Sequence, residues 1–400
     1  MHATPAVVLC DLVGESGGTE RYLERVLPEL CHAGLDLTIL ARRVDRPDAF
    51  GVPAIETPWA QEHERPSTLA AAQVERRLAR MRPAVVITSN VLDAGVLRAV
   101  RLHAPRWLAR VHDQRPFCPN GDRVFPQFPA VCKAPMGGAC AINALVRGCV
   151  CGPRAESFER IARRGAVRDE LARADRVLVS SAAMALQCER NGIEAARVAL
   201  TPPPLPRDAY GSPPENMPDR SIVFAGRLTP QKGLSSLLRA LARIDALTRP
   251  RLIVAGSGDD EEPSRALARR LGIEVEWRGW LDQRAMRAAV DASAAVVIPS
   301  LWPEPFGLVG IEAQARGRPA VAYDTGGIRD WIDGAGLTAR AGDERALAAA
   351  IEAVLDGRTW RRLARAAFDN AKTYDMDSHV RRMLALCAPQ HAERVTCASL

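Results

Sequence analysis

The sequence of 400 residues has few aromatic side chains, 5% in all, and only three lysines, Lys133, Lys232 and Lys372. Proteins that bind single-stranded nucleic acid usually interleave basic and aromatic side chains, so this composition argues against a nucleic-acid partner. No apolar run approaches the ~18 residues that a membrane span needs. With 47% apolar and 25% charged residues, the chain is expected to be globular rather than membrane-spanning or disordered.

The N-terminus has no basic flank of the kind that precedes a secretion signal, which predicts a cytoplasmic protein. The net charge is only +7, but residues 65–176 hold 20 Lys/Arg against 9 Asp/Glu. This local excess suits an anionic partner, such as a phosphorylated acceptor or the acidic inner face of a membrane. A solvated Arg-rich surface that reflects compositional bias explains the excess equally well.

Ten cysteines in a chain without a secretion signal are expected to be reduced thiols or metal ligands. Five of them fall within 34 residues, namely Cys118, Cys132, Cys140, Cys149 and Cys151. Their spacing does not match the paired two-residue gaps of common zinc modules, so packing or surface thiols are the favoured interpretation. A structural zinc ion on these five residues is the alternative.

Apolar runs alternate with helical periodicity along most of the chain, which is typical of strand-helix-strand units and parallel sheets. The predicted strands are 7–13, 35–41, 84–88, 107–111, 176–180, 222–225, 252–255, 275–278 and 295–298. The predicted helices are 19–31, 69–81, 157–173, 234–244, 263–271 and 283–293. This length and pattern predict an α/β protein of two facing Rossmann-like, doubly wound domains with a deep interdomain cleft.

The domain boundaries are set by a proline-rich stretch, which neither a helix nor a central strand tolerates. We expect an N-terminal domain over 1–205, a linker over 206–220 and a C-terminal domain over 221–375. The Cys-rich segment 113–152 is expected to be a long loop of the first domain. A last helix, about 376–395, is expected to pack back on that domain.

Ligands of open α/β sheets bind beyond the carboxyl ends of the strands, and three motifs occupy such positions. The first, Gly14 to Thr19, contains Gly17 and Gly18 ahead of a helix. Because glycine has no side chain, the backbone there can approach a ligand closely, and a purely structural turn is the alternative. It is not the dinucleotide fingerprint. The nearest match to that fingerprint, Gly256-Ser257-Gly258, lacks the third glycine, which disfavours a nicotinamide dehydrogenase.

The second motif, Gly226 to Gly233, follows the strand 222–225 and contains Arg227 and Lys232. Two cations that bracket a turn at the mouth of a sheet can converge on a diphosphate, one as a planar fork and the other as a point charge. A solvated loop is the alternative explanation. The presence of one of only three lysines here favours the diphosphate.

The third motif, Pro299 to Ala313, follows the strand 295–298 and carries Glu304 in a proline-bounded loop and Glu312 in a helix that begins near Leu308. Paired carboxylates suit sugar or ribose hydroxyls, and the amides near Gly307 suit phosphate. A retaining glycosidase also uses two carboxylates, but the sequence offers no barrel around them. A buried structural pair is the other alternative, and it leaves the second motif unexplained.

Taken together, these motifs resemble the donor half of a nucleotide-sugar-dependent, retaining glycosyltransferase of family 4 (group 1) with the GT-B fold. The resemblance runs over roughly 221–367 and includes Gly256, Gly258 and Gly326-Gly327. The first half resembles the same family more loosely, through Gly17-Gly18 and His112-Asp113. Asp330 departs from the family pattern, which commonly has Glu after the glycine pair.

The resemblance implies a role for each matching position. Arg227 and Lys232 would bind the donor diphosphate, Glu304 and His112 would contact the sugar, and Glu312 would hold the ribose. The remaining donor-side positions would contribute close backbone or amide contacts, and they are Gly17, Gly18, Gly226, Gly256, Gly258, Phe306, Gly307 and Leu308. The family is thought to need no essential metal or protein nucleophile.

The expected function is transfer of a hexose-type sugar from a nucleotide-diphosphate donor to a saccharide or lipid-linked acceptor of a cell-envelope polysaccharide or glycolipid. A nucleotide-sugar 2-epimerase of the same fold is the second possibility. A protein that binds nucleotide-sugar without turnover is the third. The sequence does not reveal the base, the sugar or the linkage.

Overall fold

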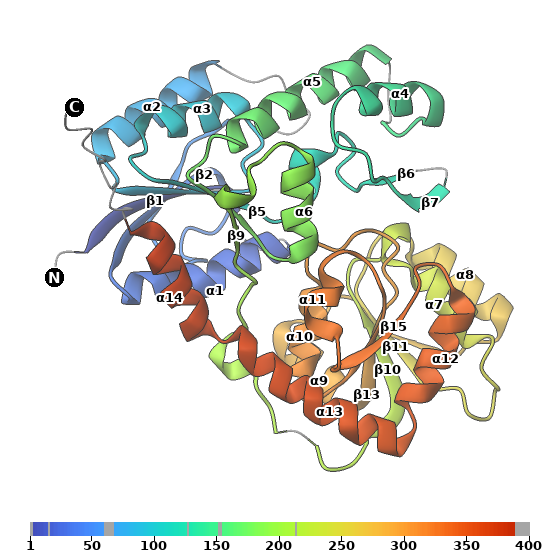
Figure 1. Ribbon diagram of the computed structural model, residues 1–400. Coiled ribbons are helices and arrows are strands. Elements are labelled where there is room, and N and C mark those ends of the chain that lie inside the picture. The colour runs from blue at the N-terminus through green and yellow to red at the C-terminus, as the bar shows by residue number, and fades with distance from the viewer. Residues whose placement is uncertain are drawn as a thin grey trace, which may run out of the picture. The chain divides into compact units, whose positions relative to one another are not determined.

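The computed structural model describes residues 3–14, 17–59, 68–125, 128–150, 154–212 and 214–388 (Figure 1). The chain forms two compact units. The first contains residues 1–110, 173–178 and 377–400, and the second contains residues 111–172 and 179–376. The boundaries expected from the sequence, 1–205, 206–220 and 221–375, stay predictions.

The first sheet has the strand order β3-β2-β1-β4-β5-β8-β9. Its strands are β1 (Thr4–Val13), β2 (Leu35–Val44), β3 (Ala54–Glu56), β4 (Val85–Ser89), β5 (Trp107–Val111), β8 (Arg176–Val179) and β9 (Val198–Leu200). The pairs β2·β3, β1·β2, β1·β4 and β4·β5 are parallel. All five residues of β4 and of β5 are buried, as expected for strands covered on both faces.

The helices of this first half include α1 (Gly18–His32), α2 (Thr68–Met81) and α3 (Ala94–His103). The last helix, α14 (Met376–Cys387), also belongs to the first unit, apart from its first residue. The Tyr22 hydroxyl of α1 lies 2.9 Å from His379 Nε2, and Arg106 Nε donates to the Leu386 carbonyl at 3.2 Å.

The second sheet has the order β12-β11-β10-β13-β14-β15, and every pair in it is parallel. Its strands are β10 (Asp219–Ala225), β11 (Arg251–Ala255), β12 (Val275–Trp277), β13 (Ser293–Ile298), β14 (Ala320–Tyr323) and β15 (Gly336–Ala339). The helices around it are α7 (Leu234–Leu241), α8 (Glu261–Leu271), α9 (Gln283–Asp291), α10 (Leu308–Gln314), α11 (Arg329–Ile332), α12 (Glu344–Val354) and α13 (Gly357–Ala371).

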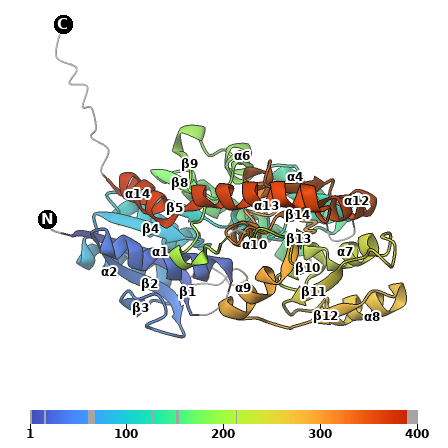
Figure 2. The same cartoon turned by 90° about the horizontal axis from the view of Figure 1, so that it is seen from below.

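Alternation along β10 shows how this sheet is covered on both faces. Ile222 and Phe224 pack in one core cluster with residues of α7, α8, α12 and α13. Val223, between them, packs in a second cluster with residues of α9, α10 and α11. Because successive strand residues point to opposite faces, helices cover both sides of the sheet (Figure 2). This confirms the expected doubly wound architecture.

The strands and helices predicted from the sequence are confirmed, with ends that differ by a few residues. The expectation of a plain loop over 113–152 is wrong. This segment contains the antiparallel strands β6 (Val124–Phe125) and β7 (Phe128–Val131) and the helix α4 (Gly138–Arg147), and α5 (Arg154–Leu171) follows it. Gly137 precedes α4 and Gly148 follows it, and both have positive φ, which glycine tolerates.

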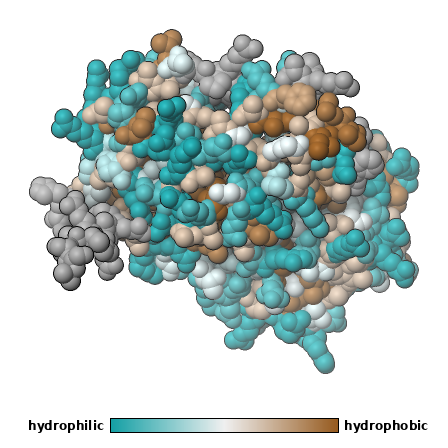
Figure 3. Space-filling view, turned by 45° about the horizontal axis from the view of Figure 1, so that its top comes forward, coloured by the Kyte–Doolittle hydropathy of each residue, from teal (hydrophilic) through white to brown (hydrophobic). Residues whose placement is uncertain are grey.

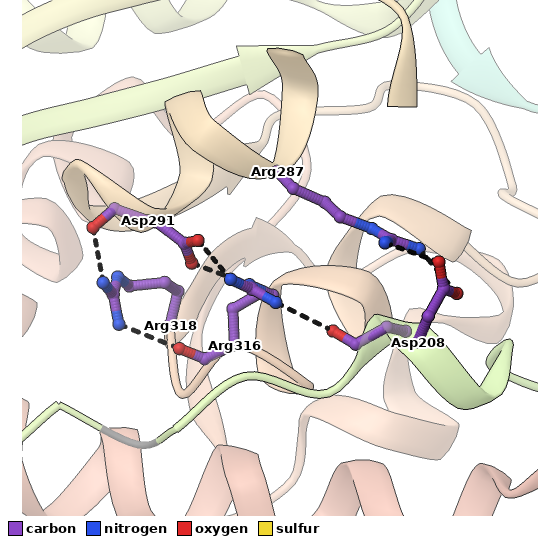
Figure 4. Close-up of polar contacts among 6 residues, drawn as sticks. Asp208, Arg287, Asp291, Arg316 and Arg318 are labelled. Carbon is purple, nitrogen blue, oxygen red and sulfur yellow. Dashed lines mark hydrogen bonds and ion pairs between the residues drawn. The ribbon is translucent and has the colours of Figure 1, made fainter. Parts of the chain in front are cut away.

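A polar network fixes the chain just before the second sheet (Figure 4). Both terminal nitrogens of Arg287, on α9, bind the Asp208 carboxylate at 2.8 and 2.9 Å. Arg316 pairs with Asp291 and also donates to the Ala209 carbonyl at 3.4 Å. Asp208 and Ala209, within the proline-rich stretch, are therefore tied to the domain that carries the second and third motifs.

We predict that Gly256→Ala destabilises the protein markedly. Gly256 has a φ of +145°, and a Cβ there would lie 1.8 Å from the Gly226 carbonyl oxygen. Overpacking of this kind costs roughly 1–3 kcal/mol in addition to the strain of positive φ. The free energy of unfolding, measured by chemical denaturation, should fall accordingly.

Gly272→Ala is the matched control, because Gly272 has a φ of +62° and nothing within 4 Å of its Cβ position. It should carry only the strain, on the order of 1 kcal/mol. Equal losses in the two variants would contradict the role of the close backbone approach.

Candidate functional site

The loop after β10 packs against the loop after β13. Gly233 has a φ of +74°, and a Cβ there would lie 1.9 Å from the Pro299 carbonyl oxygen. The Leu301 amide donates to the Gln231 carbonyl at 2.8 Å. The second and third sequence motifs therefore meet at the carboxyl end of the second sheet, where ligands of such sheets bind.

Lys232 and Glu304 come together at this junction. Lys232 Nζ lies 2.6 Å from Glu304 Oε1 and 5.2 Å from the centre of the Trp302 ring. The Glu304 side chain is 6% exposed and that of Lys232 is 21% exposed. The carboxylate of Glu304 is thus largely shielded from water, whereas the Lys232 side chain is partly accessible to solvent.

Glu304 is held ionised by its neighbours. Burial acts to raise the pKa of Glu304, but the Lys232 charge and the hydrogen bonds from Lys232 and Ser300 outweigh it, so the pKa lies below its usual range. Ser300 Oγ donates to Oε1 of the same carboxylate at 2.5 Å. Ser300, four residues before Glu304, is a member of the site to which the sequence analysis gave no role.

The glycine pair Gly326-Gly327 fixes the backbone around Glu304. The Gly327 amide donates to the Glu304 carbonyl at 2.7 Å. A Cβ on Gly326 would lie 2.1 Å from that same carbonyl oxygen. Only glycine at 326 lets the two loops approach so closely.

The start of α10 lies directly after Glu304. Gly307 precedes the helix with a φ of +89°, and Leu308 is its first residue, which confirms the predicted helix start. Phe306 is buried and its carbonyl accepts a 2.6 Å hydrogen bond from Trp331 Nε1. The Phe306 ring is therefore part of the core, and a contact of its amide with a ligand stays a prediction.

Glu312 lies on α10 and is half-buried. The hydrogen bonds that Arg287 donates to the Asp208 carboxylate chiefly raise the pKa of Arg287, and the charges of Asp208 and Glu312 add to this effect. Arg287 is thus a cation near Glu312 that sequence reasoning missed, since 25 positions separate the two residues. Arg227 is exposed in the loop after β10.

The glycines at 256 and 258 have a structural explanation, because a Cβ at either position would meet the backbone of the loop after β10. A Cβ on Gly258 would lie 2.3 Å from the Leu228 carbonyl oxygen. The Leu228 amide donates to the Ser257 carbonyl at 2.8 Å, and the Gly226 amide donates to the Ala255 carbonyl at 3.0 Å. These close contacts join the loops after β10 and β11. A contact of Gly226, Gly256 or Gly258 with a sugar donor stays a prediction.

The loop after β5 contains His112, which is half-buried. Two residues on, Gln114 Nε2 donates to the Pro303 carbonyl at 3.4 Å, next to Glu304. Gln114 is buried, and its Oε1 has no hydrogen-bond partner among the described residues. No sequence signal singled out Gln114, because its partner lies 189 residues away.

Gly17 and Gly18 belong to the first unit. Gly17 precedes α1, as predicted, whereas Gly18 is the first residue of the helix, one position earlier than expected. The Gly17 amide donates to Glu20 Oε2 at 2.8 Å. Their contact with a donor or acceptor stays a prediction.

Asp330, the departure from the family pattern, binds a helix terminus. Its Oδ2 accepts a 2.7 Å hydrogen bond from the Ala182 amide, at the start of α6 (Ala182–Arg190). Nearby, Ser180 Oγ donates to the Pro305 carbonyl at 3.0 Å. The segment 180–182 is therefore fastened to the loops that follow β13 and β14.

Four cysteines of the insertion, Cys118, Cys132, Cys140 and Cys149, are in no disulfide. Burial, together with the neighbouring Cys118, Cys140 and Cys132, raises the pKa of Cys149 to about 11. These thiols hence lie near one another, and the Cys149 thiol is protonated near neutral pH. No group of three metal-ligating side chains occurs among the described residues, and Cys151 lies outside them. The zinc alternative stays a prediction.

Two family models match the chain. The model of glycosyl transferases group 1 matches residues 210–373. The model of the glycosyl transferase 4-like domain matches residues 17–204. The two matches together take in every strand of the two sheets except β1.

Solved structures give the fold. The structure of Anabaena Alr3699/HepE in complex with UDP has a TM-score of 0.71 at 17% identity, and the match covers 95% of this chain and 98% of that one. The lipopolysaccharide outer core galactosyltransferase WaaB has a TM-score of 0.67 at 17% identity, with 96% and 99% covered. Residues 17–204 and 210–373 match glycosyltransferase domains, and the chain has the GT-B fold.

Curated proteins similar to these glycosyltransferase domains carry several names. A D-inositol 3-phosphate glycosyltransferase of Acidothermus cellulolyticus is 27% identical over 96% of this chain and 88% of its own length. A phosphatidyl-myo-inositol mannosyltransferase of Mycobacterium leprae is 32% identical over 50% of this chain and 55% of its own length. An uncharacterized glycosyltransferase of Methanocaldococcus jannaschii is 37% identical, and the match spans only 30% of it.

We predict that Lys232→Met destabilises this glycosyltransferase chain in a pH-dependent way. Without the cation, burial will raise the pKa of Glu304 above its usual value of 4.5. The free energy of unfolding should fall by ~3 kcal/mol near pH 8, as when a buried ion pair loses one partner. Near pH 5 the loss should be smaller, because the folded variant then takes up a proton more readily than the unfolded chain.

In the unchanged protein the pH dependence has the opposite sign, because the pKa of Glu304 is lowered on folding. The ionised Glu304 stabilises the fold above pH 4.5, and this stability is lost as the pH falls through the lowered pKa of the folded state. Chemical denaturation at both pH values measures these differences. The double variant Lys232→Met/Glu304→Gln should recover much of the lost stability. A loss that is the same at both pH values would contradict an ionised Glu304.

Proposed function

We propose that the chain is a retaining glycosyltransferase of family 4, which transfers a sugar from a nucleotide-diphosphate donor to a saccharide or lipid-linked acceptor. The observation that carries the proposal is the meeting of Lys232 and Glu304 at the carboxyl end of the sheet in the group 1 domain. Names of relatives also support it, since they include a D-inositol 3-phosphate glycosyltransferase and a phosphatidyl-myo-inositol mannosyltransferase. A neighbour in fold was crystallised with UDP-glucose, which supports a nucleotide-sugar donor.

The chemistry requires a cation at the leaving group. The bond between the anomeric carbon and the donor phosphate oxygen breaks, and the acceptor oxygen bonds to the same face of that carbon. The departing phosphate oxygen takes the acceptor proton. Negative charge builds up on the diphosphate, so Arg227 and Lys232 would bind it most strongly in the transition state. These two cations make an essential metal unnecessary.

Glu304 has two tasks in this proposal. Its carboxylate, kept ionised by Lys232, accepts hydrogen bonds from donor sugar hydroxyls and sets the position of the Lys232 ammonium. Main-chain amides at Phe306, Gly307 and Leu308 would meet the phosphate or sugar at the start of α10.

The positions outside this loop have proposed contacts of their own. Glu312 would hold the ribose, and His112 would contact the sugar from the loop after β5. The backbone at Gly226, Gly256 and Gly258 would contact the nucleotide. The backbone at Gly17 and Gly18 would contact the phosphates or the acceptor. An acceptor in polysaccharide or glycolipid assembly fits both this scheme and the names of the relatives.

We predict that Arg227→Ala lowers donor turnover by about 100-fold, the usual effect of losing one group that stabilises transition-state charge. Arg227 is exposed, so the variant should fold as the unchanged protein does. The measurement is nucleotide release from a panel of UDP- and GDP-sugars, followed by mass spectrometry of the products. Arg345→Ala, at another exposed arginine, is the matched control and should keep full turnover.

Equal turnover by the unchanged protein and Arg227→Ala would overturn the role of Arg227. Conversion of the donor sugar without an acceptor would instead indicate a 2-epimerase. Calorimetric binding of a nucleotide-sugar with no product under any condition would indicate a binding protein.

A further inference from the structure

The helix α4 presents its apolar face outward. Ile142, Leu145 and Val146, which are three and four positions apart and so share one face, are 64%, 51% and 76% exposed. Cys140, on the opposite face, is buried at 8%. In an ordinary surface helix the apolar face packs inward, so this orientation is reversed.

The exposed face is part of a larger apolar surface. The neighbouring helix α5 contacts α4 and exposes Phe158 at 42%. Figure 3 shows apolar atoms gathered at the upper right, over the position of α4. Clustered exposed apolar residues, unlike single ones, mark an interaction site.

The charge around α4 indicates what binds there. Between Asp122 and Glu156 the sequence has no acidic residue, and it has four basic ones, Arg123, Lys133, Arg147 and Arg154. Lys133 and Arg147 are exposed, and Arg147 directly follows the apolar face. An apolar helix face flanked by cations fits the headgroup layer of an anionic membrane, where side chains insert and cations meet phosphates.

We propose that α4 docks this chain on anionic lipid bilayers, with Ile142, Leu145 and Val146 inserted shallowly among the lipids. Such docking leaves the chain peripheral, and no helix in the described parts of the chain has the length and apolarity to cross a bilayer. The proposal does not rest on sugar transfer. It would survive the failure of the proposed function.

The test is co-sedimentation of the full chain with phosphatidylcholine vesicles, with and without phosphatidylglycerol. The unchanged protein should bind the anionic vesicles more tightly, and binding should weaken as salt rises. Ile142→Ser/Val146→Ser should bind them about tenfold or more weakly, because two inserted apolar side chains are lost. Leu247→Ser is the matched control, since Leu247 is 96% exposed outside this surface.

A charge test uses Lys133→Gln/Arg147→Gln, which should also weaken binding and flatten its salt dependence. Arg345→Gln/Arg361→Gln, at exposed positions elsewhere, should not. Circular dichroism melting of each variant verifies that it is folded.

Either of two results would overturn the proposal. One is absence of binding to anionic vesicles, or equal binding by Ile142→Ser/Val146→Ser. The other is a dimer in sedimentation velocity that the same double variant dissociates, because the occupant of the face would then be a second copy of the chain.

Discussion

The ion pair between Lys232 and Glu304 is the interaction on which the candidate site depends. A carboxylate as buried as Glu304 stays ionised only if a cation lies against it, and Lys232 is that cation. The pair in turn requires that two loops, 72 positions apart at these residues, touch. Gly233 allows this contact, and Gly326 allows the loop after β14 to pack against Glu304, because neither position has room for a Cβ.

The surrounding fold serves the same purpose. Helices on both faces bury the second sheet, so its strands end at a common edge and their loops have fixed starting points. The Asp330 carboxylate, the Ser180 hydroxyl and the Gln114 amide then bring further segments onto those loops.

The two proposals address separate parts of the chain and have a common chemical theme. The loop after β10 offers cations to a diphosphate, and the segment around α4 offers cations and apolar side chains to a lipid surface. If both hold, a lipid-linked acceptor would meet the chain where it docks. The insertion that carries α4 is rich in cysteine and poor in acidic residues, and it is folded rather than a long loop.

The sequence by itself located many of the strands and helices, because their periodicity is local, and it placed Arg227, Lys232, Glu304 and Glu312 after strand ends. Only the tertiary structure paired Lys232 with Glu304, gave Gly256 and Gly258 a packing role, and added Gln114 and Ser180. Such contacts join distant positions, which no local pattern encodes. The same holds for α4, since periodicity reveals an apolar face but not whether that face meets protein or solvent.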